Sequence, residues 1–442
     1  MATRAAAAAV LIASALIAWL TITVPIAARA LQVSIGLSMV YVAYLAWRGA
    51  REMRRALAIR RSGAGVPTGL STDLPYVSLV LPARNEATVI AASVSSLRAL
   101  RYAEAAGARA FEALVVDDGS TDGTFQEAEA AASGSENVQV RRRALGAGPG
   151  TKGSVLAFAM PYLRGDVVGV LDADTHVEPA FLERSMRAWR RDPEAAAIQV
   201  ARHPRNAGRS WLTSAQAEEQ LMDMASQCGR RATDGTAELR GNGMFVRRDV
   251  LEAVGGWSER ALTEDLELST RLSAAGHHVG LAPEVAVEEE AVETLRALWA
   301  QRLRWAEGSL RRLLEHGPGV LAGAHPIARK ADFLAFAAEF LVPPLFASTI
   351  IASLLTIPLP RPADWTVPAS LFVGYGLGVF VLALGGLSAV GVRGLPLVGR
   401  AARGALFLSH WLVVVPWALV RIAIGPERGS FVQTPRFSGT DR

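Results

Sequence analysis

The feature that most constrains this chain is a pair of apolar segments near its start, residues 5–26 and 31–47. Each has a length at which a helix crosses the hydrocarbon core of a bilayer. A bilayer admits only spans whose backbone polar groups are satisfied internally, so both segments predict helices. A cleaved signal peptide is the alternative for the first, because Arg4 precedes it and Ala28-Arg29-Ala30 resembles a cleavage site. The second apolar segment follows at once and favours two membrane helices.

Charge indicates which side of the membrane the next residues occupy. Six arginines follow the second apolar segment: Arg48, Arg51, Arg54, Arg55, Arg60 and Arg61. A basic flank of this kind marks the cytoplasmic side. The net charge of the 442 residues is only +5, and the arginines cluster beside apolar segments, which indicates a membrane surface as partner and no nucleic acid. The single cysteine, Cys228, permits no internal disulfide and no cysteine metal site.

Residues from about 76 to 200 alternate short apolar runs with helical patterns, which is typical of an α/β fold with a mostly parallel sheet. Strands are expected over 77–81, 111–116 and 138–142, in the run ending at Asp174, and over 195–200. Between them, helices are expected to about Leu100, over 124–132 and after the glycine-rich loop 146–153. Ligands of such sheets bind at the carboxyl ends of the strands.

Acidic residues follow two of these strands. Asp172 and Asp174 are spaced i, i+2, so on a strand they point to the same side. Two carboxylates there suit a hard divalent cation that carries a diphosphate, and a polar turn is the alternative. Asp117 and Asp118 could accept hydrogen bonds from a base or a ribose, or could cap a helix. Lys152 could contact a phosphate, or be a solvated loop lysine.

The second half of the predicted site lies between residues 241 and 305. The segment 241–245 indicates a close approach of the backbone, because two of its residues are glycines. Glu264 and Asp265 open a helix that runs to about Ala275, where the helix dipole keeps a carboxylate ionised, as a general base requires.

A further amphipathic helix is expected over 293–315. On it Gln301, Arg304 and Trp305 fall at i, i+3 and i+4, so they share one face. Trp299 and Arg302 are expected to anchor this helix at a membrane surface.

Three apolar segments follow, at about 331–357, 368–390 and 405–424. A cytoplasmic start and three crossings would leave the tail outside, yet arginines mark both the loop before 405–424 and the tail itself as cytoplasmic: Arg393, Arg400, Arg403, Arg421, Arg428 and Arg436. Twenty residues cannot cross twice, so we expect 405–424 to be re-entrant or interfacial.

The sequence thus predicts membrane helices with a basic flank (1–61), a linker (62–75), an α/β domain (76–292), interfacial helices (293–330), further membrane or re-entrant helices (331–427) and a cytoplasmic tail (428–442).

Four motifs occur in order along the chain: Asp117-Asp118-Gly119-Ser120, Asp172-Ala173-Asp174, Thr263-Glu264-Asp265 and Gln301-Arg302-Leu303-Arg304-Trp305. Each is weak alone, but the ordered set resembles the membrane-integrated family 2 glycosyltransferases, which include cellulose, hyaluronan and poly-N-acetylglucosamine synthases. The block from Arg240 to Trp257 also resembles bacterial glucosyl-diacylglycerol synthases. Two departures are that the lysine loop lacks the usual Ala-Leu-Asn, and that the segment before Gln301 lacks the usual Pro.

The resemblance implies a GT-A fold, a UDP-sugar donor, Mg²⁺ or Mn²⁺, and inversion at the anomeric carbon, in a bacterial-type plasma membrane with the catalytic domain cytoplasmic. It assigns nucleotide contacts to Glu86, Asp117, Asp118, Lys152 and Asp172, the metal to Asp172 and Asp174, and catalysis to Asp265 with Glu264. It assigns the diphosphate and acceptor shelf to Gln301, Arg304 and Trp305. The tail around Thr434 and Arg436 resembles the gating loop of that family, with Phe431 where Trp is usual.

Three functions remain open from the sequence. The enzyme could glycosylate a membrane lipid such as diacylglycerol, or it could build a polysaccharide. The short membrane region leaves little material for a polymer channel and favours the lipid. An inactive scaffold or channel subunit is the third, and the complete set of motif residues argues against it.

The topology gives the first testable prediction: residues 48–330 and the tail from Arg428 lie on the same, cytoplasmic, side. In a Cys228→Ser background, Ser430→Cys and Ser438→Cys are expected to resist an impermeant thiol reagent added to intact cells. Labelling from outside would place the tail externally, and the match of Thr434 and Arg436 to a gating loop would then be accidental.

Overall fold

The computed structural model describes residues 2–62, 74–102, 104–105, 108–358 and 365–425. They form two compact units. The sheet unit contains the described residues within 54–209 and 236–293, and the helical unit contains those within 2–53, 210–235 and 294–425. Neither unit is continuous in sequence.

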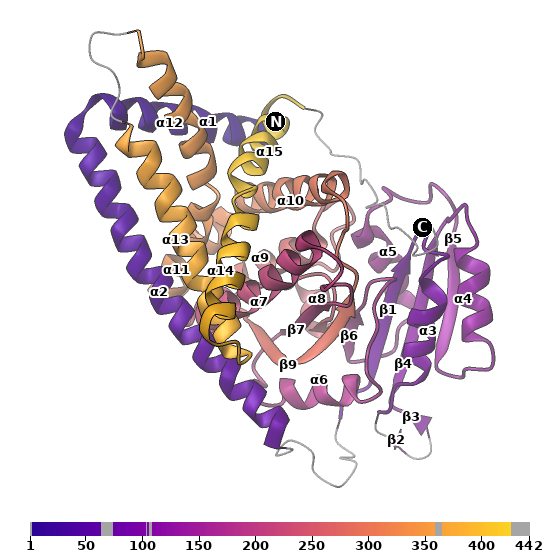
Figure 1. The fold of residues 1–442 in the computed structure, drawn as a ribbon. Helices are drawn as coiled ribbons and strands as arrows, with labels where there is room; N and C mark the ends of the chain where they lie inside the picture. The colour runs from indigo at the N-terminus through magenta and orange to yellow at the C-terminus, as the bar shows by residue number, and fades with distance from the viewer. Residues whose placement is uncertain (1, 63–73, 103, 106–107, 359–364, 426–442) are drawn as a thin grey trace. The chain divides into compact units, whose positions relative to one another are not determined.

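A seven-stranded sheet forms the sheet unit (Figure 1), in the order β5 (Val138–Arg143), β4 (Phe111–Asp118), β1 (Val77–Ala83), β6 (Val167–Val170), β8 (Met244–Arg247), β7 (Ala197–Pro204) and β9 (Val279–Glu289). All neighbours pair in parallel except β8, which is antiparallel to both β6 and β7. The expected mostly parallel α/β fold is confirmed. A separate pair of short strands, β2 (Glu104–Ala105) and β3 (Ala108–Arg109), lies outside this sheet.

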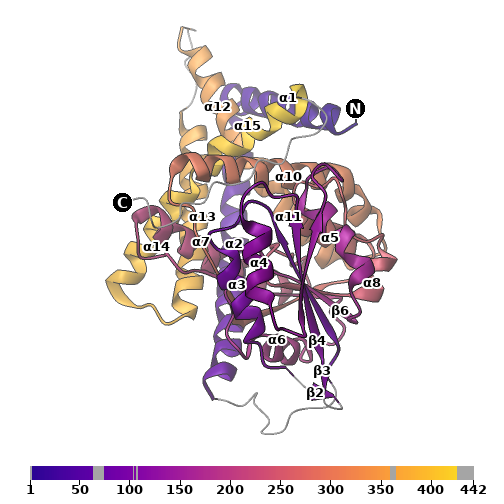
Figure 2. The ribbon, with the colours of Figure 1, turned by 90° about the vertical axis from the view of Figure 1, so that its right-hand side faces the viewer.

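Helices cover both faces of the sheet, which explains why its strands read as apolar runs (Figure 2). One core lies under α3 (Ile90–Arg98), α4 (Thr124–Ala132) and α6 (Phe181–Trp189). The other lies under α5 (Lys152–Ala159), α8 (Arg248–Ala253) and α9 (Glu264–Ala274). A single 3-10 turn, η1 (Met160–Tyr162), follows α5.

The strand before the two central aspartates is shorter than predicted. β6 ends at Val170, and Asp172 and Asp174 lie in the turn that follows it. The expectation that strand alternation points both carboxylates the same way is therefore wrong, because backbone turns and not a pleat set their directions. By contrast β4 runs to Asp118, two residues further than predicted, so Asp117 and Asp118 belong to the strand itself.

The helical unit is built from α1 (Ala2–Thr23), the part of α2 (Pro25–Ser62) up to Met53, α7 (Trp211–Arg231), α10 (Leu295–Ala322), α11 (Ile327–Glu339), α12 (Val342–Thr356), α13 (Thr366–Ala389), α14 (Gly394–Leu408) and α15 (Trp411–Ile424). One apolar core joins α1, α10 and α15. Four helical stretches in the described residues are long and apolar enough to cross a membrane: Ala2–Thr23, Pro25–Arg61, Thr366–Ala389 and Gly394–Ile424.

A fifth candidate is the pair α11 and α12, which is bent by 41° at the break between them. This sharp bend falls in the first apolar segment after α10, whereas the sequence placed the irregular segment at 405–424. In the structure α14 and α15 together form one candidate span, with Pro416 inside α15. The re-entrant path of 405–424 stays a prediction.

Helix α7 lies between β7 and β8 in the sequence but packs against α13 and α14. Its Glu218 is fully buried and accepts hydrogen bonds from Nε of Arg400 (2.9 Å) and Nε of Arg403 (2.8 Å) on α14. A buried carboxylate needs such partners, because an unpaired one would be strongly destabilising. Arg400 and Arg403, which the sequence used only as markers of topology, therefore also hold α14 against α7.

Helices α2 and α7 also cross closely. A Cβ added at Gly49 would stand 1.8 Å from the carbonyl oxygen of Ala225, and one added at Gly229 would stand 2.4 Å from that of Leu45. Gly229→Ala is expected to lower the melting temperature of the purified protein by several degrees, since overpacking costs about 1–3 kcal/mol. Gly36→Ala on the same α2 is the control, because nothing lies within 4 Å of its added Cβ. Equal melting temperatures for the two variants would contradict this packing.

Candidate active site

Lys152 lies at the centre of a group of acidic side chains in the sheet unit. Thr151 caps α5 by accepting a hydrogen bond from the Ser154 amide (3.2 Å), which places Lys152 in the first turn. The Lys152 ammonium donates to Asp172 Oδ1 (2.5 Å) and to the Gly241 carbonyl (2.8 Å), and it lies 3.5 Å from Glu264 Oε1. The alternative of a solvated loop lysine is wrong.

The glycine-containing segment 241–245, where the sequence indicated a close approach of the backbone, lies close to Asp265. Gly241 and Gly243 both have positive φ, at +76° and +69°. A Cβ on Gly241 would stand 3.1 Å from Asp265 Oδ2 and 3.6 Å from the Lys152 ammonium. Any larger residue would therefore crowd the carboxylate of the predicted base, which opens α9 next to Glu264.

Between the two glycines, Asn242 holds in place the turn that carries the predicted metal ligands. Its Oδ1 accepts hydrogen bonds from the Asp172 amide (3.2 Å) and the Thr175 hydroxyl (2.9 Å). Its Nδ2 donates to Glu289 Oε2 (2.9 Å) at the end of β9. Sequence reasoning missed both Asn242 and Glu289. The signal for Asn242 was present, since an amide between two turn glycines has its side chain available for hydrogen bonds.

Asp174 is held by the segment that follows β9. The Glu290 amide donates to Asp174 Oδ2 (3.1 Å). Just before it, His176 and Glu288 exchange two backbone hydrogen bonds of 2.9 Å, which extend the sheet past the end of β6. The turn that carries Asp172 and Asp174 is thus fixed on one side by Asn242 and on the other by β9.

The predicted nucleotide residues lie at the ends of the adjacent strands. Asp117 pairs with Ala83, the last residue of β1, and both aspartates are buried. Asp117 Oδ2 lies 3.2 Å from Arg142 Nε, and Asp118 Oδ1 accepts from Arg143 Nε at 2.7 Å. Neither caps α4, whose N-cap is Gly123.

Glu86 lies in the loop that follows β1. Its amide donates to Thr124 Oγ1 (2.7 Å), and the amide of the preceding Asn85 donates to Ser120 Oγ (2.9 Å). The loop after β1 is therefore joined to the turn after β4. Eight predicted residues of the sheet unit thus lie at or near the carboxyl ends of its strands: Glu86, Asp117, Asp118, Lys152, Asp172, Asp174, Glu264 and Asp265.

The remaining predicted residues belong elsewhere. Gln301, Arg304 and Trp305 lie on α10 of the helical unit with the expected helical spacing. Arg302 is not an interfacial anchor, because it is 2% exposed and forms an ion pair with Glu219 of α7. Its guanidinium carbon lies 4.2 Å from the centre of the Trp305 ring, so Arg302 supports that indole. Thr434 and Arg436 lie outside the described residues.

The carboxylates suit a divalent cation that is shared with a ligand. No group of three or more His, Cys, Asp or Glu side chains among the described residues could hold a metal by itself. Asp172 and Asp174 offer two carboxylates on one turn, and Mg²⁺ is often held by one or two carboxylates together with substrate phosphates. The pair therefore fits a cation that arrives with a diphosphate.

Burial shifts the pKa values of two acids in this region. Burial raises the pKa of the Glu264 carboxyl to about 7, although the Lys152 ammonium lowers it and the Asp265 carboxylate raises it further. Burial also raises the pKa of the Glu289 carboxyl, against the opposing effect of Arg202. Acids with raised pKa values beside a cleft are typical of functional sites.

Comparison with known proteins identifies the class. Residues 167–420 match the family described as Glycosyl transferase family group 2, and residues 78–255 match Glycosyl transferase family 2. The first match covers more than half of the chain, so the chain belongs to the family 2 glycosyltransferases and is a hexosyltransferase.

The similar proteins indicate what kinds of transfer the family performs. The chain is 32% identical over 412 residues to the beta-monoglucosyldiacylglycerol synthase of a Synechocystis species, covering 91% of this chain and 85% of that protein. It is 29% identical to the poly-beta-1,6-N-acetyl-D-glucosamine synthase of Staphylococcus aureus, covering 55% of this chain and 56% of that one.

A solved structure shares the fold. It is the mannosyltransferase PcManGT from Pyrobaculum calidifontis, in complex with GDP-Man and Mn²⁺. The TM-score is 0.58 at 18% identity, covering 88% of this chain and 98% of that one. This agreement confirms the predicted GT-A-like fold.

The raised pKa of Glu264 gives a prediction for stability. The unfolded carboxyl titrates near 4.5 and the folded one near 7, so the folded state binds more protons between these values. Stability therefore falls as pH rises through this window. Thermal unfolding of the wild type and Glu264→Gln from pH 5 to 8 is expected to show the wild type losing stability relative to the variant, whose amide does not titrate. Parallel profiles would contradict the shift.

Proposed function

We propose that this chain transfers a hexose from a UDP-sugar to the hydroxyl group of a diacylglycerol-type membrane lipid, forming a β-linkage. The observation that carries the proposal is the extent of the similarity to beta-monoglucosyldiacylglycerol synthase. That similarity covers 91% of this chain, so it extends beyond the sheet unit into the apolar segments. The similarity to the polysaccharide synthase covers only 55%. Polysaccharide synthesis is the second candidate.

The proposed chemistry is a single displacement. Asp265 takes the proton of the acceptor hydroxyl as that oxygen attacks the anomeric carbon of the sugar. The bond from this carbon to the diphosphate oxygen breaks, and UDP leaves with the electron pair. No enzyme nucleophile takes part, so an α-linked donor yields a β-linked product.

Other residues position the reactants. Glu86, Asp117 and Asp118 are proposed to bind the uridine, while Gln301, Arg304 and Trp305 are proposed to contact the diphosphate and the acceptor. Asp172 and Asp174 would hold Mg²⁺ or Mn²⁺, which when bound offsets the charge that develops on the leaving diphosphate. Lys152 keeps Asp172 and the Gly241 carbonyl in place.

The location follows from the same proposal. The candidate spans would make the chain an integral protein of a bacterial-type plasma membrane. The sheet unit would lie in the cytoplasm, because the basic residues after position 47 mark that side and UDP-sugars are the proposed donors.

Labelled donors test the acceptor directly. Membranes containing the protein are incubated with radiolabelled UDP-glucose, UDP-N-acetylglucosamine or UDP-galactose, and the label is followed into a chloroform–methanol extract and into ethanol-insoluble polymer. Asp265→Asn membranes are the control for background transfer. We expect label in the lipid extract, in a β-linked product. Label confined to polymer would establish the second candidate instead.

A pair of variants tests the residue roles. Asp265→Asn is expected to reduce transfer by about 10²–10⁴-fold while UDP affinity is retained, because only the proton acceptor is lost. Asp174→Ala is expected to lose the increase in UDP affinity on adding Mg²⁺ or Mn²⁺. Calorimetric titration with UDP, with and without the cation, measures the UDP affinity of both variants. The labelled-donor assay measures their transfer rates. Near-normal turnover of a folded Asp265→Asn, or cation-dependent UDP binding by Asp174→Ala, would refute the respective assignment.

A further inference from the structure

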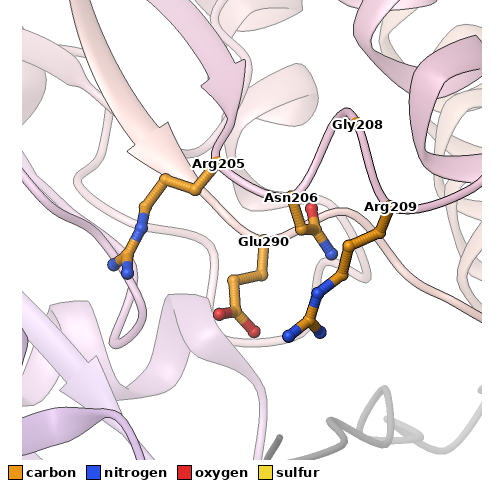
Figure 3. A pocket seen from close by; sticks show the side chains of 5 residues that line it. All are labelled: Arg205, Asn206, Gly208, Arg209 and Glu290. Carbon is orange, nitrogen blue, oxygen red and sulfur yellow. The ribbon is translucent and has the colours of Figure 1, made fainter.

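A pocket of about 360 Å³ lies at the carboxyl ends of β7 and β9, next to the predicted metal site. It is lined by Arg205, Asn206, Gly208, Arg209 and Glu290 (Figure 3). These residues come from the two segments that follow β7 and β9, which are parallel neighbours whose carboxyl ends lie together. The function described above uses none of the pocket's side chains.

The base of this pocket is rigid. Asn206 Nδ2 donates to the Ala291 carbonyl (2.8 Å), and its Oδ1 accepts from the Ala291 amide (2.9 Å). The Arg205 amide donates to the Glu289 carbonyl (2.8 Å). Arg209 Nη1 donates to Glu293 Oε1 (2.6 Å). Hydrogen bonds thus join the two segments, and the pocket is preformed.

Two charged side chains in this pocket are available for a ligand. Within the described part of the chain, the guanidinium of Arg205 and the carboxylate of Glu290 make no hydrogen bond and no ion pair. Figure 3 shows the Glu290 side chain between those of Arg205 and Arg209. A donor group and an acceptor group therefore line the same pocket with hydrogen-bonding capacity unused.

The sheet order places this pocket on a definite side of the reaction centre. The predicted uridine-binding residues lie at the end of β4 and in the loop after β1, and the predicted metal residues follow β6. The pocket follows β7 and β9, on the opposite side of β6 from the nucleotide. The Glu290 amide binds Asp174 directly, so the pocket adjoins the metal site.

We propose that this pocket binds a neutral, hydroxyl-rich part of the acceptor, such as a sugar ring or the glycerol of a lipid; the acceptor role rests on the proposed function. Charge selects this class, because Arg205 and Arg209 are balanced by Glu290 and by Glu293, which pairs with Arg209. An anion would face the Glu290 carboxylate. Neighbouring hydroxyl groups can donate to that carboxylate and accept from Arg205 at the same time.

Direct binding tests the proposal without any transfer reaction. Full-length protein in phosphatidylcholine nanodiscs, free of sugar detergents, is titrated with methyl β-D-glucoside, with glycerol and with inorganic phosphate, each followed by saturation-transfer NMR. Arg205→Ala and Glu290→Gln are each expected to weaken glucoside or glycerol binding about tenfold or more, the effect of losing one charge-assisted hydrogen bond. UDP affinity should not change.

Two variants serve as matched controls. Arg247→Ala removes an exposed arginine at the other end of the sheet, where Arg247 pairs with Val167 at the start of β6. Glu194→Gln removes an exposed acid that precedes β7. Both are expected to bind the probes as the wild type does.

Each outcome has one meaning. Tighter binding of the glucoside than of glycerol identifies the ligand as a sugar, and equal binding identifies it as a glycerol-like head group. Either result supports the proposal when the pocket variants lose binding of the probe. Binding of phosphate instead, binding unaffected by Arg205→Ala and Glu290→Gln, or loss of UDP affinity in these variants would each overturn it. If labelled sugar enters neither lipid nor polymer while the pocket variants lose glucoside binding, the proposed function is wrong but the binding site is supported.

Discussion

The arrangement of the candidate active site depends on the ammonium group of Lys152, which lies among acidic side chains. Lys152 contacts Asp172 and the Gly241 carbonyl and lies near Glu264, so it connects α5, the turn after β6, the glycine loop and α9. Without this cation, carboxylates gathered in a largely buried site would repel each other and each would carry a desolvation cost. The same contacts keep the predicted base on α9 close to the turn that carries the predicted metal ligands.

The sequence was sufficient to locate this edge but not its internal bonding. Apolar runs ending in acids predicted which strand ends carry Asp117, Asp118 and Asp172, because parallel strands place their carboxyl ends together. It could not show that Lys152 faces inward, since a glycine-rich loop permits many side-chain directions. Nor could it show Asn242 joining Asp172 to Glu289, because these residues lie far apart in the chain and only the pairing of β6, β8, β7 and β9 brings them close.

Helix assignments in the helical unit followed from hydrophobicity, while the partners of each helix did not. Arg302 illustrates the limit. Its sequence context, an arginine beside tryptophans on an amphipathic helix, is typical of a membrane surface. Its environment in the structure is the opposite, since Glu219 neutralises it and Trp305 covers it. The acid that decides the matter is on α7, whose place in the helical unit no local pattern reveals.

The position of α7 in the sequence has a consequence for biosynthesis. Helix α7 ends at Arg231, but its partner α14 is complete only at Leu408. At typical rates of chain elongation of about 5–20 residues per second, the ribosome adds those residues in roughly 10–35 seconds. During that interval the carboxylate of Glu218 lacks the arginines that later neutralise it, and β8 and β9 emerge while α7 is still without these contacts. The strands β8 and β9 are therefore synthesised before the two arginines that neutralise Glu218 on α7.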